Sequence, residues 1–360
     1  MTVATVDSLV CSLGWGHEQV HLLNDARTGL EAVIAIHSTA LGPALGGLRL
    51  RPYPGGMAEA LDDALQLSRA MTLKAAAAGL DLGGGKAVVL DDGDAASRTL
   101  RLSAMAREID RLGGAYITAE DVGTTTADMD LIAAHTSHVV GRTERDGYGG
   151  DPSPDTARTV FGGIRAAFSA LEGESDLAGR RVGVIGLGKV GAHLAGLLIE
   201  AGATVVGYDP SAAALGGCRD GVVPAASAEA VLAADLEVVA PCALGGLIDA
   251  EGAERLRCRV VCGAANNPLA GPDTAAALAR RGILYVPDFL ANCGGLIHAD
   301  TERLGAGGGE RLELALAEAE RRTREVLVEA LETSELPTTI AEERAWSRIR
   351  AAGPAAAPSL

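Results

Sequence analysis

A glycine-rich segment between two apolar runs constrains the fold of this chain more than any other feature. The stretch RVGVIGLGKVGAHLAGLLIEAGATVVGYD, residues 181–209, is typical of a strand, a tight turn, a helix and a second strand. Its turn fits the pattern G-x-G-x-x-G through Gly186, Gly188 and Gly191. The pattern alone is weak, but Asp209 ends the second strand 18 residues after Gly191 and completes the context. The segment therefore predicts a parallel α/β sheet that binds a dinucleotide.

Each part of this turn has a physical role in that prediction. The first glycine permits the tight turn, the second lets a pyrophosphate approach the backbone, and the third lets helix and strand pack closely. The helix that starts at Lys189 and Val190 directs its partial positive charge at the phosphates. The Asp209 carboxylate suits the ribose hydroxyls and would repel a 2′-phosphate, and the following PSAA supplies no arginine. The sequence favours NAD over NADP; the alternative is a turn that binds nothing.

The rest of the chain alternates between expected strands and helices, which is typical of α/β folds with right-handed crossovers. We expect a Rossmann-type NAD-binding domain over residues 146–330 and an N-terminal α/β substrate and oligomerisation domain over residues 1–145. A Gly-, Pro- and Asp-rich linker at 144–155 separates them. A C-terminal helical segment, 331–360, is expected to pack back on the first domain. The individual strands are expected at 29–37, 87–90, 115–119, 236–240, 259–264 and 283–288, and the helices at 57–70, 97–112, 156–171 and 310–335.

Charge and cysteine content exclude several classes of function. The net charge of −16 repels phosphate backbones and acidic lipids, so neither nucleic acid nor a membrane is expected as a partner. No signal-peptide pattern or membrane-length apolar run is present, which favours the cytoplasm. Of the six cysteines, Cys258 and Cys262 are expected on one face of a strand about 13 Å apart, too far for a shared metal or a disulfide. We therefore expect reduced thiols and no metal.

The lysines are unusually placed. The chain has 28 arginines but three lysines, and Lys74 and Lys86 lie in the nearly uncharged segment MTLKAAAAGLDLGGGKAVV. Arginine does not lose its proton in proteins, whereas a desolvated lysine can, so the pair points to a site where a proton moves. The alternative is two lysines that only extend to the surface. The glycines at 83–85 suggest close approach of a ligand to the backbone; the rival interpretation, a phosphate loop, lacks the following Ser or Thr.

Asp121 is the candidate acid of the same region. It follows the expected strand at 115–119 and precedes Gly123, so its carboxylate is expected to leave a strand end and enter a cleft. The ordinary alternative is a helix N-cap.

Several segments together resemble one enzyme family, the leucine/valine/phenylalanine dehydrogenases related to glutamate dehydrogenase. The resemblance runs from about residue 17 to about residue 305. The segments that carry it are HSTALGPALGGLRL, MTLKAAAAGLDLGGGKAVV, YITAEDVGTT, GDPSPDTA, VIGLGKVGAHLA, APCALGG, CGAANN and PDFLANCGGLIHAD.

The resemblance implies a role for each matching residue. Lys74 would bind the substrate α-carboxylate with Gly47 and Asn266, Lys86 would act on the attacking water, and Asp121 would shuttle protons. Thr156 and Asn292 would hold the nicotinamide end of NAD, with Ala240 and Cys242 of APCALGG also in the cofactor site. The walls around the substrate side chain would be Leu45, Ala119, Leu296 and Ala299.

The implied activity is reversible oxidative deamination of an apolar L-amino acid of the valine, leucine or isoleucine type to its 2-keto acid and ammonia, by a homo-oligomer. An aromatic, phenylalanine-type dehydrogenase is one alternative, since PDFLAN and GGLIH resemble such members. A catalytically silent dinucleotide-binding protein is the other. The chain departs from the family pattern at Cys293 and Thr159, where alanine and glycine are usual; neither change removes a reacting group.

Overall fold

The computed structural model describes residues 4–5, 16–145, 149–218, 220–243, 245–305 and 309–353. The chain forms two compact units. The first contains residues 1–151, 299–309 and 345–360, and the second contains residues 152–298 and 310–344.

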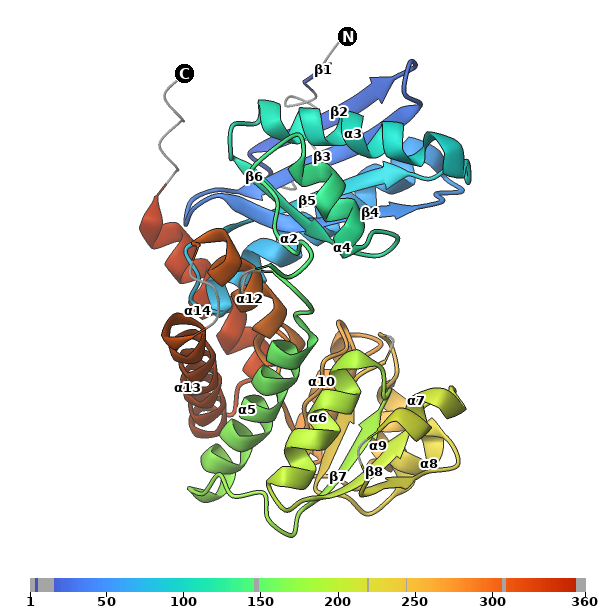
Figure 1. Cartoon of the computed structure of the whole chain (residues 1–360). Helices are drawn as coiled ribbons and strands as arrows, with labels where there is room; N and C mark the ends of the chain where they lie inside the picture. Colours follow the sequence, from blue (N-terminus) through green and yellow to red (C-terminus); the bar gives the residue numbers. More distant parts are fainter. Residues whose placement is uncertain are drawn as a thin grey trace. The chain divides into compact units, whose positions relative to one another are not determined.

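A six-stranded mixed sheet forms the centre of the first unit, in the order β1-β2-β3-β5-β4-β6 (Figure 1). Strand β3 pairs antiparallel with β5, whereas β4 pairs parallel with both β5 and β6. The carboxyl ends of β4 and β6 therefore lie at the same edge. The strands are β1 Ala4–Thr5, β2 Gln19–Asp25, β3 Leu30–Ser38, β4 Ala44–Arg51, β5 Gly83–Leu90 and β6 Tyr116–Glu120.

Helices cover both faces of this sheet. Helix α2, Gly56–Ala77, packs on the face that carries Val88, while α3, Ala95–Arg111, and α4, Thr126–Ala133, share an apolar cluster with Val89 on the other face. Both faces are buried, which explains the nearly continuous apolar strand segments in the sequence. Side chains alternate between the two faces along a strand. The face of any strand residue therefore follows from the apolar cluster, that of Val88 or that of Val89, to which its neighbours along the strand belong.

The second unit has a parallel six-stranded sheet in the order β12-β11-β10-β7-β8-β9. Counting from β7, this is the order 3-2-1-4-5-6 read in reverse, the arrangement of dinucleotide-binding folds. The strands are β7 Arg181–Ile185, β8 Thr204–Tyr208, β9 Val222–Pro224, β10 Val238–Pro241, β11 Val260–Val261 and β12 Leu284–Tyr285. The helices are α5 Ser153–Glu172, α6 Lys189–Glu200, α7 Ala212–Gly217, α8 Ala228–Ala233, α9 Ala250–Arg255, α10 Pro272–Arg280, α11 Asp288–Ala291 and α13 Glu310–Thr333.

The division into units differs from the predicted boundaries. The chain changes unit after residue 151 rather than 145, residues 299–309 belong to the first unit, and residues 331–344 belong to the second. Two of the changes of unit, after residues 298 and 344, fall inside α12, Gly294–Arg303, and α14, Pro337–Ala352, so no Gly- or Pro-rich linker marks them. The end of α14 packs on the first unit: the Arg348 guanidinium donates to the Leu80 carbonyl at 2.7 Å.

The cysteine prediction needs one correction. The chain bends at Arg259, where the backbone N–H groups of Arg259 and Val260 both donate to the Glu237 carbonyl, and the alternation of side chains breaks there. Cys258 and Cys262 consequently lie in apolar clusters on different faces of the sheet, not on one face. Cys258 and Cys262 are both buried, and none of the five described cysteines forms a disulfide; Cys11 lies outside the described residues.

No helix in the part of the chain that the structure describes is long and apolar enough to cross a membrane.

Candidate functional site

Lys86 and Asp121 form a close ion pair in the first unit. Lys86 Nζ lies 2.6 Å from Asp121 Oδ2, and the lysine side chain is only 6% exposed. Lys86 comes from β5 and Asp121 from the loop that follows β6, with the intervening β4 between these strands in the sheet. The structure thus brings together the two residues predicted to move protons.

Hydrogen bonds to β4 fix the loop that carries Asp121. The backbone N–H of Asp121 donates to Thr124 Oγ1 at 2.9 Å, and this hydroxyl lies 2.9 Å from the Leu48 carbonyl, to which it donates. Gly123 adopts φ +83°, and a Cβ there would lie 1.7 Å from the Leu50 carbonyl oxygen, so only glycine fits. Asp121 is not a helix cap, because Thr125 caps α4.

Burial and charge shift the pKa values of this pair. Burial lowers the pKa of the Lys86 ammonium below its usual value, and the attraction of Asp121 offsets only part of that effect. For Asp121, burial alone would raise the pKa, but the neighbouring Lys86 and Arg49 outweigh it and hold the pKa below its usual range. The site therefore combines an ionised carboxylate with a lysine that gives up its proton more readily than a solvated one. The two groups titrate as a coupled pair.

Sequence reasoning missed three further members of this cluster. Arg49 donates from Nε to Asp121 Oδ2 at 2.9 Å and from Nη1 to both oxygens of Asp63 on α2, at 3.1 and 3.0 Å. The Tyr53 hydroxyl also donates to Asp63, at 2.6 Å. The alternation of side chains in GGLRLR could have placed Arg49 on the same face as Gly47. No such signal could have found Asp63, because only the packing of α2 on the sheet brings it to Arg49.

The glycines at 83–85, for which the sequence suggested a ligand, are required by the packing of the sheet itself. They lie buried in β5, where a Cβ on Gly83 would lie 1.9 Å from the Ser38 carbonyl oxygen and one on Gly84 would lie 2.1 Å from the Thr72 nitrogen. A Cβ on Gly85 would meet the Tyr116 ring at 2.6 Å. The three glycines therefore make room for neighbouring strands and for α2.

The other predicted substrate residues of the first unit lie on related elements. Leu45 and Gly47 alternate with the cluster residues Ala44 and Leu48, so they share the α2 face of the sheet with Lys86. Gly47 lies beside Asp121, whose Cβ would be 2.7 Å from a Cβ at this position. The remaining predicted substrate residues of this unit are Ala119 on β6, which pairs with Gly47 of β4, Lys74 in the last turn of α2, and Ala299 on α12.

Two predicted substrate residues belong to the second unit. Asn266 is exposed after β11, and Leu296 is buried on α12. Their roles toward the substrate, like those of Lys74, Gly47, Leu45, Ala119 and Ala299, remain predictions.

The glycine-rich turn of the second unit has the geometry expected of a phosphate site. Gly186 follows β7 with φ +97°, and a Cβ on Gly191 would lie 1.9 Å from the Gly186 carbonyl oxygen. At Gly188, the N-cap of α6, an added Cβ would meet no protein atom within 4 Å. The first and third glycines are thus needed by the fold itself, whereas the second leaves open space before the helix that begins with Lys189 and Val190.

Asp209 is fixed at the end of β8 beside this turn. Its Oδ2 accepts a hydrogen bond from the Leu187 N–H at 2.8 Å, and its Oδ1 accepts one from the Ser211 N–H at 2.8 Å. Each carboxylate oxygen retains a lone pair for a ribose hydroxyl. The negative charge at this position opposes a 2′-phosphate.

The predicted nicotinamide end contains a polar side chain with unused capacity. Asn292 is 4% exposed and donates from Nδ2 to Asn266 Oδ1 at 2.8 Å and to the Ala264 carbonyl at 3.1 Å. Its Oδ1 has no hydrogen-bond partner among the described residues. A buried orphan acceptor is costly, and the carboxamide N–H₂ of a nicotinamide is a suitable donor for it. These residues fit a bound NAD.

The three other residues of the cofactor prediction differ in where they lie. Cys242 follows β10, and a Cβ on Gly191 would lie 3.4 Å from its own Cβ, so it lies under the glycine turn. Thr156 is half-buried in the first turns of α5. Ala240 is different: it is fully buried in the apolar core, so its side chain does not face a bound cofactor.

The two departures from the family pattern both have structural contacts. Thr159 Oγ1 accepts a hydrogen bond from the Gly294 N–H at 3.0 Å and so joins α5 to the start of α12. Cys293 is buried, with its Sγ 3.1 Å from the Leu290 carbonyl. Nearby, His298 Nδ1 lies 2.8 Å from Asp155 Oδ2, a pair that the sequence did not indicate.

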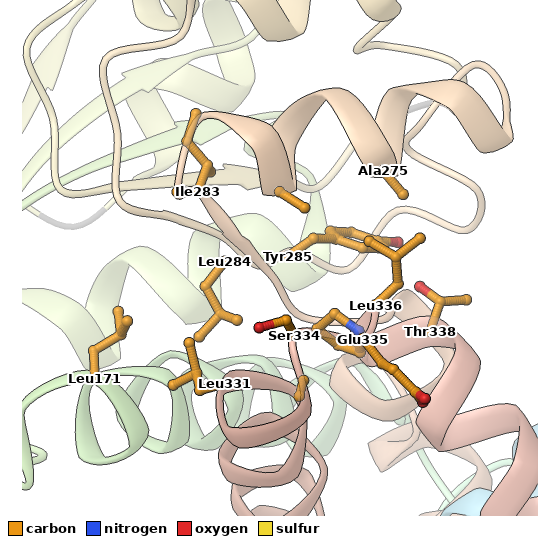
Figure 2. Close-up of a pocket in the computed structure, with 14 residues that line it drawn as sticks. Leu171, Ala275, Ile283, Leu284, Tyr285, Leu331, Ser334, Glu335, Leu336 and Thr338 are labelled. Atoms are coloured by element: carbon orange, nitrogen blue, oxygen red, sulfur yellow. The ribbon is translucent and has the colours of Figure 1, made fainter.

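A cavity of about 230 Å³ in the second unit lies away from these residues (Figure 2). It is lined by the end of α5 at Leu171, by Ile283 and Leu284 at the start of β12, and by the turn from Ser334 to Thr338. Dinucleotides bind at the carboxyl ends of such strands, so this cavity is not the cofactor site. Within the described residues, no cluster of His, Cys, Asp and Glu could hold a metal ion.

Three ranges of the chain match known protein families. Residues 17–138 match the profile of the Glu/Leu/Phe/Val dehydrogenase dimerisation domain, and residues 211–335 match that of glutamate/leucine/phenylalanine/valine dehydrogenase. Residues 165–244 match the NAD-binding domain of D-isomer specific 2-hydroxyacid dehydrogenases.

Individual relatives cover most of the chain. It is 44% identical to a valine dehydrogenase of Streptomyces virginiae over 81% of this chain and 82% of that protein. It is 43% identical to a valine dehydrogenase of Streptomyces coelicolor over 94% of each. The crystal structure of L-tryptophan dehydrogenase from Nostoc punctiforme is 33% identical with a TM-score of 0.83, and the match covers 96% of this chain and 99% of that one.

Proposed function

The chain belongs to the glutamate/leucine/phenylalanine/valine dehydrogenase family, and from this premise we propose that it deaminates a branched apolar L-amino acid. The products are the 2-keto acid and ammonia, the cofactor is NAD, and the reaction is reversible. The observation that carries the proposal is the buried contact between Lys86 and Asp121, 2.6 Å long. A catalytically silent dinucleotide-binding protein would have no use for a desolvated lysine held against a carboxylate.

The residues of the first unit account for the proton movements. When bound, NAD supplies the acceptor for the hydride that leaves Cα. Asp121 takes the proton that the α-ammonium group must lose before this transfer. Lys86, neutral, takes a proton from the water that attacks the resulting imine carbon. Asp121 returns a proton to the amine as the C–N bond of the carbinolamine breaks; the carbinolamine hydroxyl loses its proton to bulk water and becomes the keto carbonyl, and ammonia leaves.

Lys74, with Gly47, binds the α-carboxylate in this proposal. A charged hydrogen bond at that group orients Cα without taking part in the chemistry. In the second unit, the nicotinamide is held by Thr156 and Asn292, and the ribose is bound by Asp209. The pyrophosphate is bound by the start of α6 and the glycine turn, Gly186, Gly188 and Gly191.

The residues predicted to surround the substrate side chain determine the substrate class. Leu45, Ala119, Leu296 and Ala299 are all apolar. A distal carboxylate placed among them would lose its hydration without a compensating cation, which costs several kcal/mol. Glutamate is therefore a very poor substrate. The two valine dehydrogenases among the relatives support the branched aliphatic class.

An aromatic substrate is the second candidate. It is supported by the similarity to the L-tryptophan dehydrogenase and by the small side chains of Ala119 and Ala299, which leave room for a ring.

An NADH-consumption assay with ammonia and a panel of 2-keto acids tests the proposal. The expected result is the highest kcat/KM for the keto acids of valine, leucine or isoleucine. A maximum for the phenylalanine or indole analogue would select the aromatic candidate, and a maximum for 2-ketoglutarate would contradict both. No turnover with any of them would favour the silent alternative.

We also propose that the protein works in the cytoplasm as a homo-oligomer. Support comes from the free thiols at the described cysteines and from the match of residues 17–138 to a domain named for dimerisation. Light scattering on the purified chain would measure its assembly state.

A further inference from the structure

Arg49 connects two carboxylates beside the proton-transfer pair. Its Nε donates to Asp121 Oδ2 at 2.9 Å, and its Nη1 donates to Asp63 at 3.0 Å. The guanidinium side chain is 19% exposed, so these contacts are only weakly screened by water. The cluster draws on three elements: β4 for Arg49, α2 for Asp63, and the loop after β6 for Asp121.

We infer that Arg49 is a positioning residue that aims the Asp121 carboxylate and takes a share of its negative charge. Asp63 holds the guanidinium in place from the opposite side. The inference rests on the proposed function of the Lys86–Asp121 pair, but its direct test does not depend on turnover.

The geometry at Asp121 explains why orientation matters. Lys86 and Arg49 both contact Oδ2, whereas Oδ1 receives no hydrogen bond from the part of the chain that the structure describes. Two donors on one oxygen fix the rotation of the carboxylate. Oδ1 is thereby left as the oxygen that can exchange a proton with the substrate amine.

The charges explain how Arg49 affects Lys86. The two nitrogens contact the same oxygen at 2.6 and 2.9 Å, so they are separated by no more than about 5.5 Å. At that distance two positive charges repel appreciably even at an effective dielectric constant of about 20. Lys86 therefore holds its proton less firmly beside a carboxylate that it shares with Arg49 than it would beside a carboxylate that it alone contacts.

The largest influences on the Lys86 pKa act in both directions. Asp121 and the more distant Asp63 raise the pKa of Lys86, whereas burial and Arg49 lower it. Tyr116 of β6, in the apolar cluster on the other face of the sheet, stays neutral because burial raises its pKa. Loss of Arg49 should thus raise the pKa of Lys86, and loss of the Asp63 charge should lower it.

The chain allows the Lys86 pKa to be measured directly. It has three lysines, Lys74, Lys86 and Lys189, so protein labelled with ¹³C at lysine Cε gives three signals that single substitutions can assign. The titration of the Lys86 signal reports its protonation in the absence of any substrate.

Arg49→Met is the principal variant, with Arg51→Met as its matched control. Arg51 lies on the same strand and face and approaches Asp63 at 3.6 Å, and it forms ion pairs with Asp63 and Glu59 rather than with Asp121. In Arg49→Met the Lys86 pKa should rise by about one unit or more. The midpoint of the rise of kcat/KM with pH should shift to higher pH by the same amount. Arg51→Met should change neither.

Arg49→Lys separates charge from geometry. It keeps the charge but loses the planar fork that contacts both carboxylates, so the Lys86 pKa should stay near that of the unaltered protein while kcat falls. A folded Arg49→Met protein with an unchanged Lys86 pKa and an unchanged pH profile would overturn the inference.

Asp63→Asn keeps the inference testable if Arg49→Met does not fold. It keeps the size of the side chain and removes the anion, so the Lys86 pKa should fall, opposite in sign to the change in Arg49→Met. An unchanged or higher pKa would again overturn the inference. If the unaltered protein lacks dehydrogenase activity, the proposed function fails, and these titrations still decide the effect of Arg49 on Lys86.

Discussion

Lys86 Nζ and Asp121 Oδ2 lie 2.6 Å apart in a setting where the lysine is almost entirely buried. The contact joins the middle of one strand to the loop after another, and Thr124 and Gly123 hold that loop in place. A desolvated ammonium next to a carboxylate can pass its proton to a reacting group and recover it, which is the chemistry that reversible deamination needs. The predictions below test this pair and the cofactor site.

The pH dependence of deamination should reflect the lowered pKa of Lys86. The lysine acts as a base only when neutral, so kcat/KM should rise with pH and level off once the pair has lost a proton. The midpoint should lie below 10.5, the usual value for lysine, because burial lowers the Lys86 pKa. Initial rates between pH 6 and 11 would measure it. A midpoint at or above the usual lysine value would contradict the assignment.

Cofactor choice should depend on the charge of Asp209. In Asp209→Asn the side chain keeps its shape and can still accept from the Leu187 N–H, but it no longer repels a 2′-phosphate. The ratio of kcat/KM for NAD over NADP should fall at least about tenfold, since charged hydrogen bonds contribute roughly 1.5–3 kcal/mol. Asp209→Ala should lower it too, with added loosening of the turn. Equal use of both cofactors by the unaltered protein would refute the role of Asp209.

The glycines of the turn should separate folding from cofactor binding. Gly188→Ala adds a methyl group that meets no protein atom, at a φ of −65° that alanine adopts readily, so Tm should not fall. The methyl group would occupy the phosphate approach and raise the NADH Kd. Gly191→Ala should lower Tm, because its Cβ would lie 1.9 Å from a carbonyl oxygen. Thermal melts measure the change in Tm, and NADH fluorescence titrations measure the change in Kd. Normal NADH affinity in Gly188→Ala would show that the phosphates do not bind at this turn.

Lys74→Ala should act mainly on substrate binding. Loss of a charged hydrogen bond to the α-carboxylate should raise KM about 10- to 100-fold, with a smaller loss of kcat from misorientation. Steady-state kinetics with the best amino acid would show the split. An unchanged KM would mean that another residue binds the carboxylate.

Much of the fold followed from the sequence because its signals were local. The glycine turn and the alternation of apolar runs predicted the parallel sheet of the second unit, and the rarity of lysine singled out Lys86. Asp121 stood out because polar residues at strand ends are informative. Each of these signals is contained within one element or at its end.

What the sequence did not reveal depended on contacts between distant segments. Arg49 is one of 28 arginines, and only the packing of α2 on the sheet gives it Asp63 as a second partner. The packing role of the glycines at 83–85 was not foreseen because glycine in a sequence looks the same whether a ligand or another strand needs the space. The changes of unit within α12 and α14 were missed because a continuous helix carries no boundary signal.

The most direct test of the central claim is the turnover of Lys86→Arg, measured together with its affinity for NADH. Arginine keeps the positive charge beside Asp121 but cannot release a proton. Loss of a positioned acid–base group typically costs about 10²- to 10⁴-fold, so kcat should fall within or beyond that range while the NADH Kd stays within about twofold of the unaltered protein. A Lys86→Arg protein with near-normal kcat would contradict the account by removing Lys86 from the proton transfer.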